Sequence, residues 1–311
     1  MTELLGKKLK ADPRVQEAKR LLSEALEEYQ SRITGLKNAD PARVQDYQQL
    51  LAQCGQLRGG NLYYPYLSTG IGRGALVELA DGSVKYDFIT GIGVHYFGHS
   101  HPILLTSGVD AALEDTVTQG NLQQGLSTVA FLELLVDGAC RRGASLNHCF
   151  LTSSGAMANE NALKMIFQRH APANRFLAFA RCFAGRSMVL CQITDKPVNR
   201  EGLPKVLDVD YVPFFDPKSP TESTKLAVET LQRHLTQYPG KYAGMMFELI
   251  QGEGGYYPGT REFFVALMDV LKKNQVAVFI DEIQTFGRTS ELFAFQYFGL
   301  DKYVDVVTVG K

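Results

Sequence analysis

The stretch from residue 276 to 284, VAVFIDEIQ, decides the fold of this chain. Five apolar residues run without interruption and end at Asp281, a pattern typical of a strand that is buried on both faces of a parallel sheet. Open α/β sheets bind their ligands at the carboxyl ends of such strands. We therefore expect Asp281 at a ligand-binding edge, paired with a cation if it is buried. A solvated acid that starts a loop is the alternative.

Working outward, strands and helices alternate over the second two thirds of the chain. Apolar runs predict strands at 148–152, 176–180, 242–250, 276–283 and 304–309, and helical spacing predicts helices at 156–168, 223–237 and 261–273. This alternation indicates the α/β class, with a mostly parallel sheet covered by helices on both faces.

The first hundred residues have a different texture. Asp12-Pro13 and Asp40-Pro41 each place a capping aspartate before a proline, which is typical of helix starts. Two alternating runs on either side of Asp81-Gly82 predict a hairpin in a small antiparallel sheet, followed by a glycine-rich loop. We therefore expect a helical arm over 1–58, a small antiparallel and glycine-rich segment over 59–105, and a large α/β domain over 106–311.

Composition excludes several classes of function. The 311 residues carry 32 Lys and Arg against 33 Asp and Glu, a net charge of −1, which argues against a nucleic-acid or membrane partner. The five cysteines are odd in number and form no C-x-x-C, so we expect neither a disulfide framework nor a zinc ribbon. No signal peptide and no apolar run of about 20 residues stands out. We expect a cytoplasmic protein.

Two further segments suggest chemistry. Small residues at Ser154-Gly155 lie between a predicted strand and a predicted helix, where free backbone N–H groups favour a phosphate; a plain serine cap is the alternative. The strand at 304–309 leads to Lys311, and a lysine held in a site can form a Schiff base. A solvated lysine is the alternative here. His99 and its neighbours at 95 and 101 have no obvious acidic partner, so we expect no metal site.

Taken in order, these segments resemble the class III aminotransferases, the family of ornithine, acetylornithine and 4-aminobutyrate aminotransferases. The resemblance runs from about residue 59 to 311. It rests on the D-G hairpin through GHSHP (81–102), SGAMANENALK (154–164), FAGRS (183–187), ELIQGEGG (248–255), DEIQTFGRTS (281–290) and DVVTVGK (305–311). It implies a fold-type I transferase that depends on pyridoxal 5'-phosphate.

The resemblance also implies a role for each site residue. Lys311 would hold the cofactor as an internal aldimine and move the proton, and Asp281 would pair with the pyridinium nitrogen. Glu253 matches a glutamate that pairs with an active-site arginine, so that one site accepts both an ω-amine and an α-amino acid. The remaining contacts to the cofactor fall on Ser154, Gly155 and Ala156 (backbone N–H groups to the phosphate), Phe183 and Ile283 (the two ring faces) and Gln284 (the ring hydroxyl).

The implied reaction moves an amino group, from the ω-carbon of a diamine or amino acid, to a 2-oxo acid such as 2-oxoglutarate, with ping-pong half-reactions in a homodimer. The sequence departs from the family at Met157, Ala184 and Leu249, and the loop at 285–287 is one residue shorter. Met157 and Ala184 leave open an aminomutase, epimerase or decarboxylase on the same fold.

The end of the chain is the largest departure from the family. Family members continue beyond the lysine into a C-terminal small domain, which is absent from these 311 residues. We expect a fragment of a longer enzyme, with little or no turnover by the 311 residues alone. A truncated, non-catalytic paralogue that pairs with a complete enzyme is the alternative.

Overall fold

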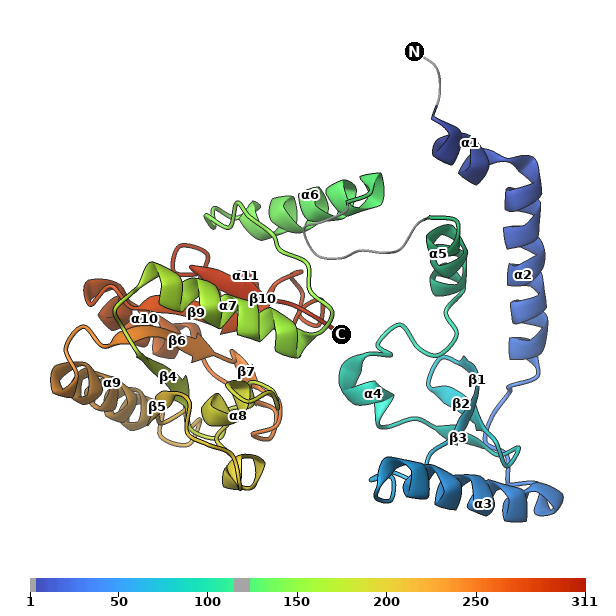
Figure 1. Cartoon of the computed structure of the whole chain (residues 1–311), viewed down its shortest axis with the longest axis horizontal. Coiled ribbons are helices and arrows are strands. Elements are labelled where there is room, and N and C mark those ends of the chain that lie inside the picture. Colours follow the sequence, from blue (N-terminus) through green and yellow to red (C-terminus); the bar gives the residue numbers. More distant parts are fainter. Residues whose placement is uncertain (1–3, 115–123) are drawn as a thin grey trace. The chain divides into compact units, whose positions relative to one another are not determined.

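The computed structural model describes residues 4–114 and 124–311. It contains two compact units, Met1–Thr118 and Gln119–Lys311, coloured blue to blue-green and green to red in Figure 1. Each unit is described by itself below. The division into three parts expected from the sequence stays a prediction.

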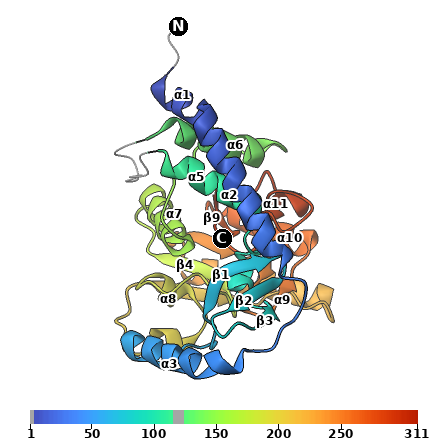
Figure 2. The same ribbon diagram turned by 90° about the vertical axis from the view of Figure 1, so that its right-hand side faces the viewer.

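Helices make up most of unit 1 (Figure 2). Both predicted helix starts are confirmed: a carboxylate oxygen of Asp12 accepts a hydrogen bond from the backbone N–H of Arg14 (2.9 Å), and Asp40 does the same for Ala42 (3.0 Å). These caps satisfy N–H groups that have no acceptor within the helix. The helices are α1 (Leu5–Ala11), α2 (Pro13–Ser31), α3 (Pro41–Arg58), α4 (Thr90–Gly93) and α5 (Pro102–Ala112).

The sheet of unit 1 has three antiparallel strands, β1 (Ser68–Arg73), β2 (Leu76–Leu79) and β3 (Val84–Tyr86), in the order β1-β2-β3. The predicted hairpin between β2 and β3 is confirmed. Asp81 holds its turn by accepting hydrogen bonds from the backbone N–H (2.9 Å) and the hydroxyl (2.6 Å) of Ser83. Gln30, near the end of α2, donates to the Gly72 carbonyl (2.7 Å) and so ties that helix to β1.

Unit 2 is built on a parallel sheet in the order β10-β9-β6-β4-β5. The α/β class predicted from the sequence is therefore confirmed. The strands are β4 (Arg175–Phe179), β5 (Asp208–Val212), β6 (Tyr242–Phe247), β9 (Ala277–Asp281) and β10 (Val306–Thr308).

One predicted strand is wrong and one was missed. Residues 148–152 form no strand, because a short apolar run shows a preference for extended backbone but does not provide a neighbouring strand to pair with. Conversely, β5 reads DVDYV, and its aspartates hide the strand from a search for apolar runs. Arg175 of β4 pairs with Asp208 (3.4 Å) and Asp210 (2.6 Å).

Helices cover both faces of the sheet. Phe176 and Ala178 of β4 belong to one buried cluster with α7, whereas Leu177 and Phe179 belong to a second cluster with α9 and α10. Alternate residues of the strand thus point to opposite faces. The helices are α6 (Leu126–Cys140), α7 (Gly155–Arg169), α8 (Leu190–Ile193), α9 (Pro220–Gln237), α10 (Arg261–Lys273) and α11 (Ala294–Tyr297), with a 3-10 turn at Pro197–Arg200 and short strands β7 (Ile250–Gln251) and β8 (Tyr257–Pro258).

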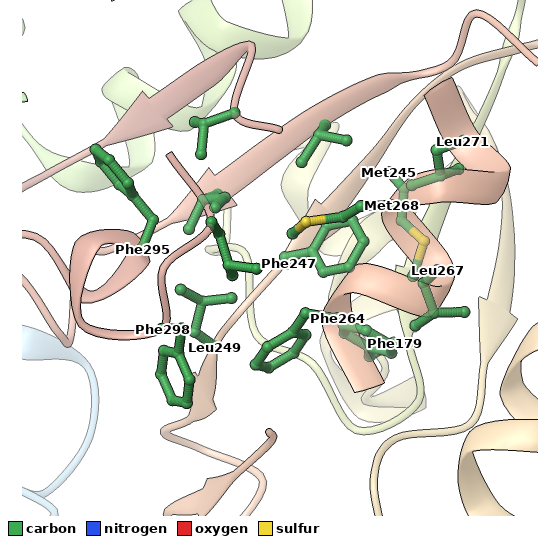
Figure 3. Close-up of a cluster of buried hydrophobic side chains, with 14 of the residues drawn as sticks. Phe179, Met245, Phe247, Leu249, Phe264, Leu267, Met268, Leu271, Phe295 and Phe298 are labelled. Carbon is green, nitrogen blue, oxygen red and sulfur yellow. The ribbon is translucent and has the colours of Figure 1, made fainter. Parts of the chain in front are cut away.

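The second cluster is the larger core of the unit (Figure 3). The ring of Phe264 on α10 packs edge-on against the rings of Phe247 and Phe298, with centroid distances of 6.2 Å and 5.4 Å. Edge-on packing matches the positive ring edge to the negative ring face. Among the described residues, no helix is both long and apolar enough to cross a bilayer.

Candidate active site

The ends of β9 and β10 lie side by side and carry two of the predicted site residues. Thr308, the last residue of β10, stands directly opposite Asp281, the last residue of β9. The Glu282 N–H donates to the Thr308 carbonyl (2.9 Å) and extends the pairing by one step. Lys311 follows three residues after Thr308. The acid and the lysine are therefore brought to the same edge of the sheet, as the sequence predicts.

Ile283 brings a third segment to this edge. A methyl group placed on Gly155 would lie 2.8 Å from Cδ1 of Ile283, and one placed on Gly310 would lie 3.1 Å from the same atom. A side chain at either glycine would press against Ile283, so both glycines allow this side chain to pack closely on the backbone. The start of α7, the turn after β9 and the segment leading to Lys311 are therefore packed together.

Asp281 is buried, and both of its oxygens accept hydrogen bonds. The Ile283 N–H donates to Oδ1 (2.9 Å), and Nδ2 of Asn159 donates to Oδ2 (2.7 Å). Burial raises the pKa of Asp281 to about 6, although these two donors and the nearby Lys311 charge act in the opposite direction. The carboxylate therefore favours a protonated nitrogen as a further partner.

The ammonium group of Lys311 lies within the influence of the same carboxylate. Loss of hydration lowers the pKa of Lys311; the charge of Asp281 acts against this shift and that of Arg288 adds to it. A lowered pKa increases the share of free amine, the form that acts as a nucleophile or base.

The N-terminus of α7 provides a place for an anion. Ser154 caps this 15-residue helix, its Oγ accepting from the Met157 N–H (3.2 Å). The first N–H groups of a helix have no acceptors within it, so the amides of Gly155 and Ala156 can bind a phosphate. The serine cap and the anion site, alternatives in the sequence, are compatible in the structure.

A buried glutamate that sequence reasoning quoted only as part of a motif holds the loop of Phe183. Glu248 accepts from the Phe183 N–H (2.9 Å) and the Gly252 N–H (3.3 Å). Burial, with a smaller contribution from the charge of Asp281, raises the pKa of Glu248 to about 8. An acid directly after the apolar strand at 242–247 was the available signal. Thr194 also holds the loop, accepting from the Ala184 N–H (3.0 Å).

The last two predicted residues lie around Gly252. A methyl group placed on Gly252 would be 3.1 Å from Cγ of Gln284, so that side chain packs on the turn after β7. Glu253 is exposed and forms an ion pair with Lys196 (3.3 Å). In this structure the cation beside Glu253 is therefore a lysine.

The histidines of unit 1 correct one expectation. His99 does have an acidic partner, because its Nε2 lies 2.8 Å from Oδ2 of Asp87. The ring of His95 stacks on that of His99 at 4.5 Å, and Nδ1 of His101 accepts from the N–H of Ile103 at the start of α5 (3.2 Å). Within the described ranges, no group of three or more His, Cys, Asp or Glu residues has the arrangement of a metal site.

Fold and site together define a class of protein. A parallel sheet ordered as above, an acid and a lysine at the ends of neighbouring strands, and a helix N-terminus beside them make up the large domain of fold-type I pyridoxal-phosphate enzymes. The model of the family "Aminotransferase class-III" matches residues 64–311. The chain belongs to that family.

Curated relatives include the acetylornithine aminotransferase of Bacillus subtilis, which is 32% identical over 242 residues, or 77% of this chain and 57% of the relative. The acetylornithine aminotransferase of Methanocaldococcus jannaschii is 28% identical over 247 residues, or 77% of this chain and 56% of the relative. The chain therefore spans a little over half the length of these relatives.

Solved structures show the same fold. The lysine aminotransferase of M. tuberculosis, in its internal aldimine form, has a TM-score of 0.69 at 23% identity, over 84% of this chain and 65% of that one. The taurine:2-oxoglutarate aminotransferase of Bifidobacterium kashiwanohense, in complex with PLP and glutamate, has a TM-score of 0.72 at 18% identity, over 84% of this chain and 61% of that one.

The residues present fit pyridoxal phosphate, the cofactor of this family. Its phosphate suits the start of α7, where the first backbone N–H groups have no acceptor within the helix. Its ring nitrogen suits the buried Asp281 carboxylate, and its aldehyde suits an amine with a lowered pKa, which Lys311 provides. Each of the three reactive parts of the molecule thus has a chemically matched group in unit 2.

Proposed function

We propose that this chain carries the cofactor site of a pyridoxal-phosphate-dependent aminotransferase, which moves an amino group from a donor amine to a 2-oxo acid. The observation that carries the proposal is the pairing of β9 with β10, which brings Asp281 and Lys311 to one edge of the sheet. The names of the relatives, acetylornithine aminotransferase above all, favour transfer over an aminomutase, epimerase or decarboxylase reaction. An ω-amino donor and 2-oxoglutarate as acceptor are part of this proposal and rest on the resemblance of the sequence to the family.

Each site residue then has a task. When bound, the cofactor supplies an aldehyde and an electron-withdrawing ring. The ionised Asp281 carboxylate would accept a hydrogen bond from the protonated ring nitrogen and so favour the cationic form of that nitrogen. Nζ of Lys311 would hold the aldehyde end of the cofactor, and its free amine would carry the proton from the amino-bearing carbon of the substrate.

The remaining predicted residues bind and orient. The amides at Ser154, Gly155 and Ala156 would bind the phosphate, and Phe183 and Ile283 would pack on the two ring faces. Gln284 would donate to the ring hydroxyl. Glu253 would regulate access of the substrate carboxylate by opening and closing an ion pair with an active-site arginine; in this structure it pairs with Lys196.

We propose a homodimer as well. Unit 1 exposes large aromatic side chains, among them Phe88 (91% exposed) and Tyr63 (90%). Apolar surface of this kind is typical of subunit interfaces. The cytoplasmic location stays a prediction from the sequence.

Labelling of Lys311 tests the proposed function. The purified chain is incubated with pyridoxal phosphate, reduced with borohydride and digested, and the modified peptide is identified by mass spectrometry. We expect the label on Lys311. K311A loses the label, because it removes the amine that would react with the aldehyde.

Lys302, an exposed lysine of the same unit, supplies the matched control. K302A keeps the label if the chemistry belongs to Lys311. A label spread over surface lysines, or unchanged in K311A, contradicts the proposal.

A further inference from the structure

One buried amide connects the parts of the site that would surround the cofactor. Asn159, in the second turn of α7, is 1% exposed. Its Nδ2 donates to Oδ2 of Asp281 (2.7 Å) and to the carbonyl of Ala184 (2.8 Å), and its Oδ1 accepts from Oγ1 of Thr308 (2.7 Å). A single side chain on α7 thus contacts the loop after Phe183 and the ends of β9 and β10.

The surroundings allow only one orientation of this amide. The Ala184 carbonyl can only accept, and so can the Asp281 carboxylate in its ionised form, so both require the NH₂ group of Asn159. If the amide were turned over, its oxygen would face these two acceptors without a hydrogen between them. The Thr308 hydroxyl completes the arrangement because it donates to the oxygen that remains. Both amide protons and the oxygen are therefore in use.

We infer that Asn159, held in orientation by Thr308, is a positioning residue for Asp281: it fixes the direction of the carboxylate and favours its ionised form. This inference rests on the proposed function for its consequence in catalysis, but the contacts themselves do not. Asn159 leaves a second lone pair on Oδ2 of Asp281, so the carboxylate can still receive a proton donor from a ligand.

The electrostatic setting explains why such a donor matters. Burial raises the pKa of Asp281, and the other titratable groups around it are Lys311, Glu248, Glu282 and Cys182. Lys311 favours the ionised form, whereas the two glutamates oppose it when charged. A donor to the carboxylate stabilises its charge where water is excluded. Without Asn159, Asp281 would more readily take a proton and would lose its hold on a cationic ring nitrogen.

The first test measures proton binding by Asp281 in the chain without cofactor. Aspartate residues are labelled with ¹³C at the carboxyl carbon, D281N identifies the signal of Asp281, and the signal is followed from pH 3 to 9. We expect N159A to raise the proton affinity of Asp281 about tenfold, as loss of a hydrogen bond to a charged group predicts. Glu248, Glu282 and Lys311 remain in every variant, so the difference belongs to Asn159.

Thr308 supplies a matched pair that changes less of the structure. T308V removes the hydroxyl but keeps the shape, and T308S keeps the hydroxyl. We expect T308V to shift the titration of Asp281 in the same direction, about threefold, and T308S to restore the wild-type curve. If N159A does not fold, this pair decides the question.

A second readout uses pyridoxal phosphate itself. We expect its dissociation constant to rise about tenfold in N159A, and the pH at which the absorption band of the bound cofactor changes to shift together with the titration of Asp281. Variants that lose thermal stability but leave the Asp281 titration at its wild-type position overturn the inference, since Asn159 would then only fill space. Failure of the wild-type chain to bind the cofactor overturns the proposed function instead, and the first test still stands.

Discussion

The two units of this chain treat their aromatic side chains in opposite ways. In unit 2, Phe179, Phe247 and Phe264 are fully buried and pack edge to face in one core. In unit 1, Phe88 and Tyr63 are among the most exposed large side chains. The difference shows what the sheets can cover: five parallel strands have helices on both faces, whereas three short antiparallel strands bury few side chains of their own.

We infer from this contrast that unit 2 contributes most to the stability of the fold and unit 1 to association with a second molecule. Unit 2 contains the residues whose burial maintains the fold, and the cofactor site is built on its strand ends. Unit 1 presents apolar surface that a second molecule could cover. Substitutions that are similar in chemistry should therefore have very different consequences in the two units.

Phe264→Ala in unit 2 has the largest expected effect. Removing a fully buried ring leaves a cavity between α10 and the sheet, which costs about 3–5 kcal/mol in the free energy of unfolding. The measurement is denaturant unfolding followed by circular dichroism. Exposed Leu226→Ala on α9 of the same unit is the control, with a change within about 0.5 kcal/mol. A loss below about 1 kcal/mol for Phe264→Ala would contradict the picture of a tightly packed core.

The sequence predicts the α/β class of unit 2 correctly, although it misplaces individual strands. Helix α10 is found at the predicted residues 261–273. Its apolar stripe indicates a helix, and its position before an apolar strand indicates the same. The strand predicted at 148–152 fails because pairing is a property of two segments, and periodicity describes only one. Strand β5 was missed because the two acids that pair with Arg175 occupy a short strand.

The site also contains residues that the sequence predicts and residues that it does not. Asp281 and Lys311 were predictable because each follows an apolar strand, and parallel strands end at the same edge. Asn159 and Glu248 were not assigned a role, although both lie in quoted motifs. Their importance comes from contacts across more than 60 residues of sequence, Asn159 with Asp281 and Glu248 with Phe183. A one-dimensional pattern contains no information on such contacts.

Glu248→Gln tests how ionisation of this buried glutamate changes the free energy of unfolding of unit 2. The fold raises the pKa of Glu248 from 4.5 to about 8, so the folded chain binds this proton more tightly than the unfolded chain. The contribution of the protonated form is therefore complete below pH 4.5 and is lost as the pH rises to about 8.

Relative to E248Q, which cannot ionise, the wild-type chain should lose stability over this pH range by an amount on the order of a few kcal/mol. Denaturant unfolding of both proteins at pH 5 and pH 9 measures the difference. Glu282 remains in both chains, so its own titration cancels. An equal difference at the two pH values would mean that Glu248 is ionised throughout.

Phe88→Ser in unit 1 has the smallest expected effect on stability and sharpens the comparison most. The ring is already in contact with water, so its removal should change the free energy of unfolding of the monomer by less than about 0.5 kcal/mol. If the exposed aromatic side chains of unit 1 pack against a second copy, the same substitution should raise the dissociation constant of the dimer about tenfold, because buried aromatic side chains contribute strongly to interfaces. Sedimentation velocity over a range of concentrations measures that constant.

Leu226→Ser, an equally simple loss of exposed apolar surface in unit 2, should leave both quantities unchanged. A dimer weakened equally by both variants would place the interface in both units, and one weakened by neither would remove Phe88 from it.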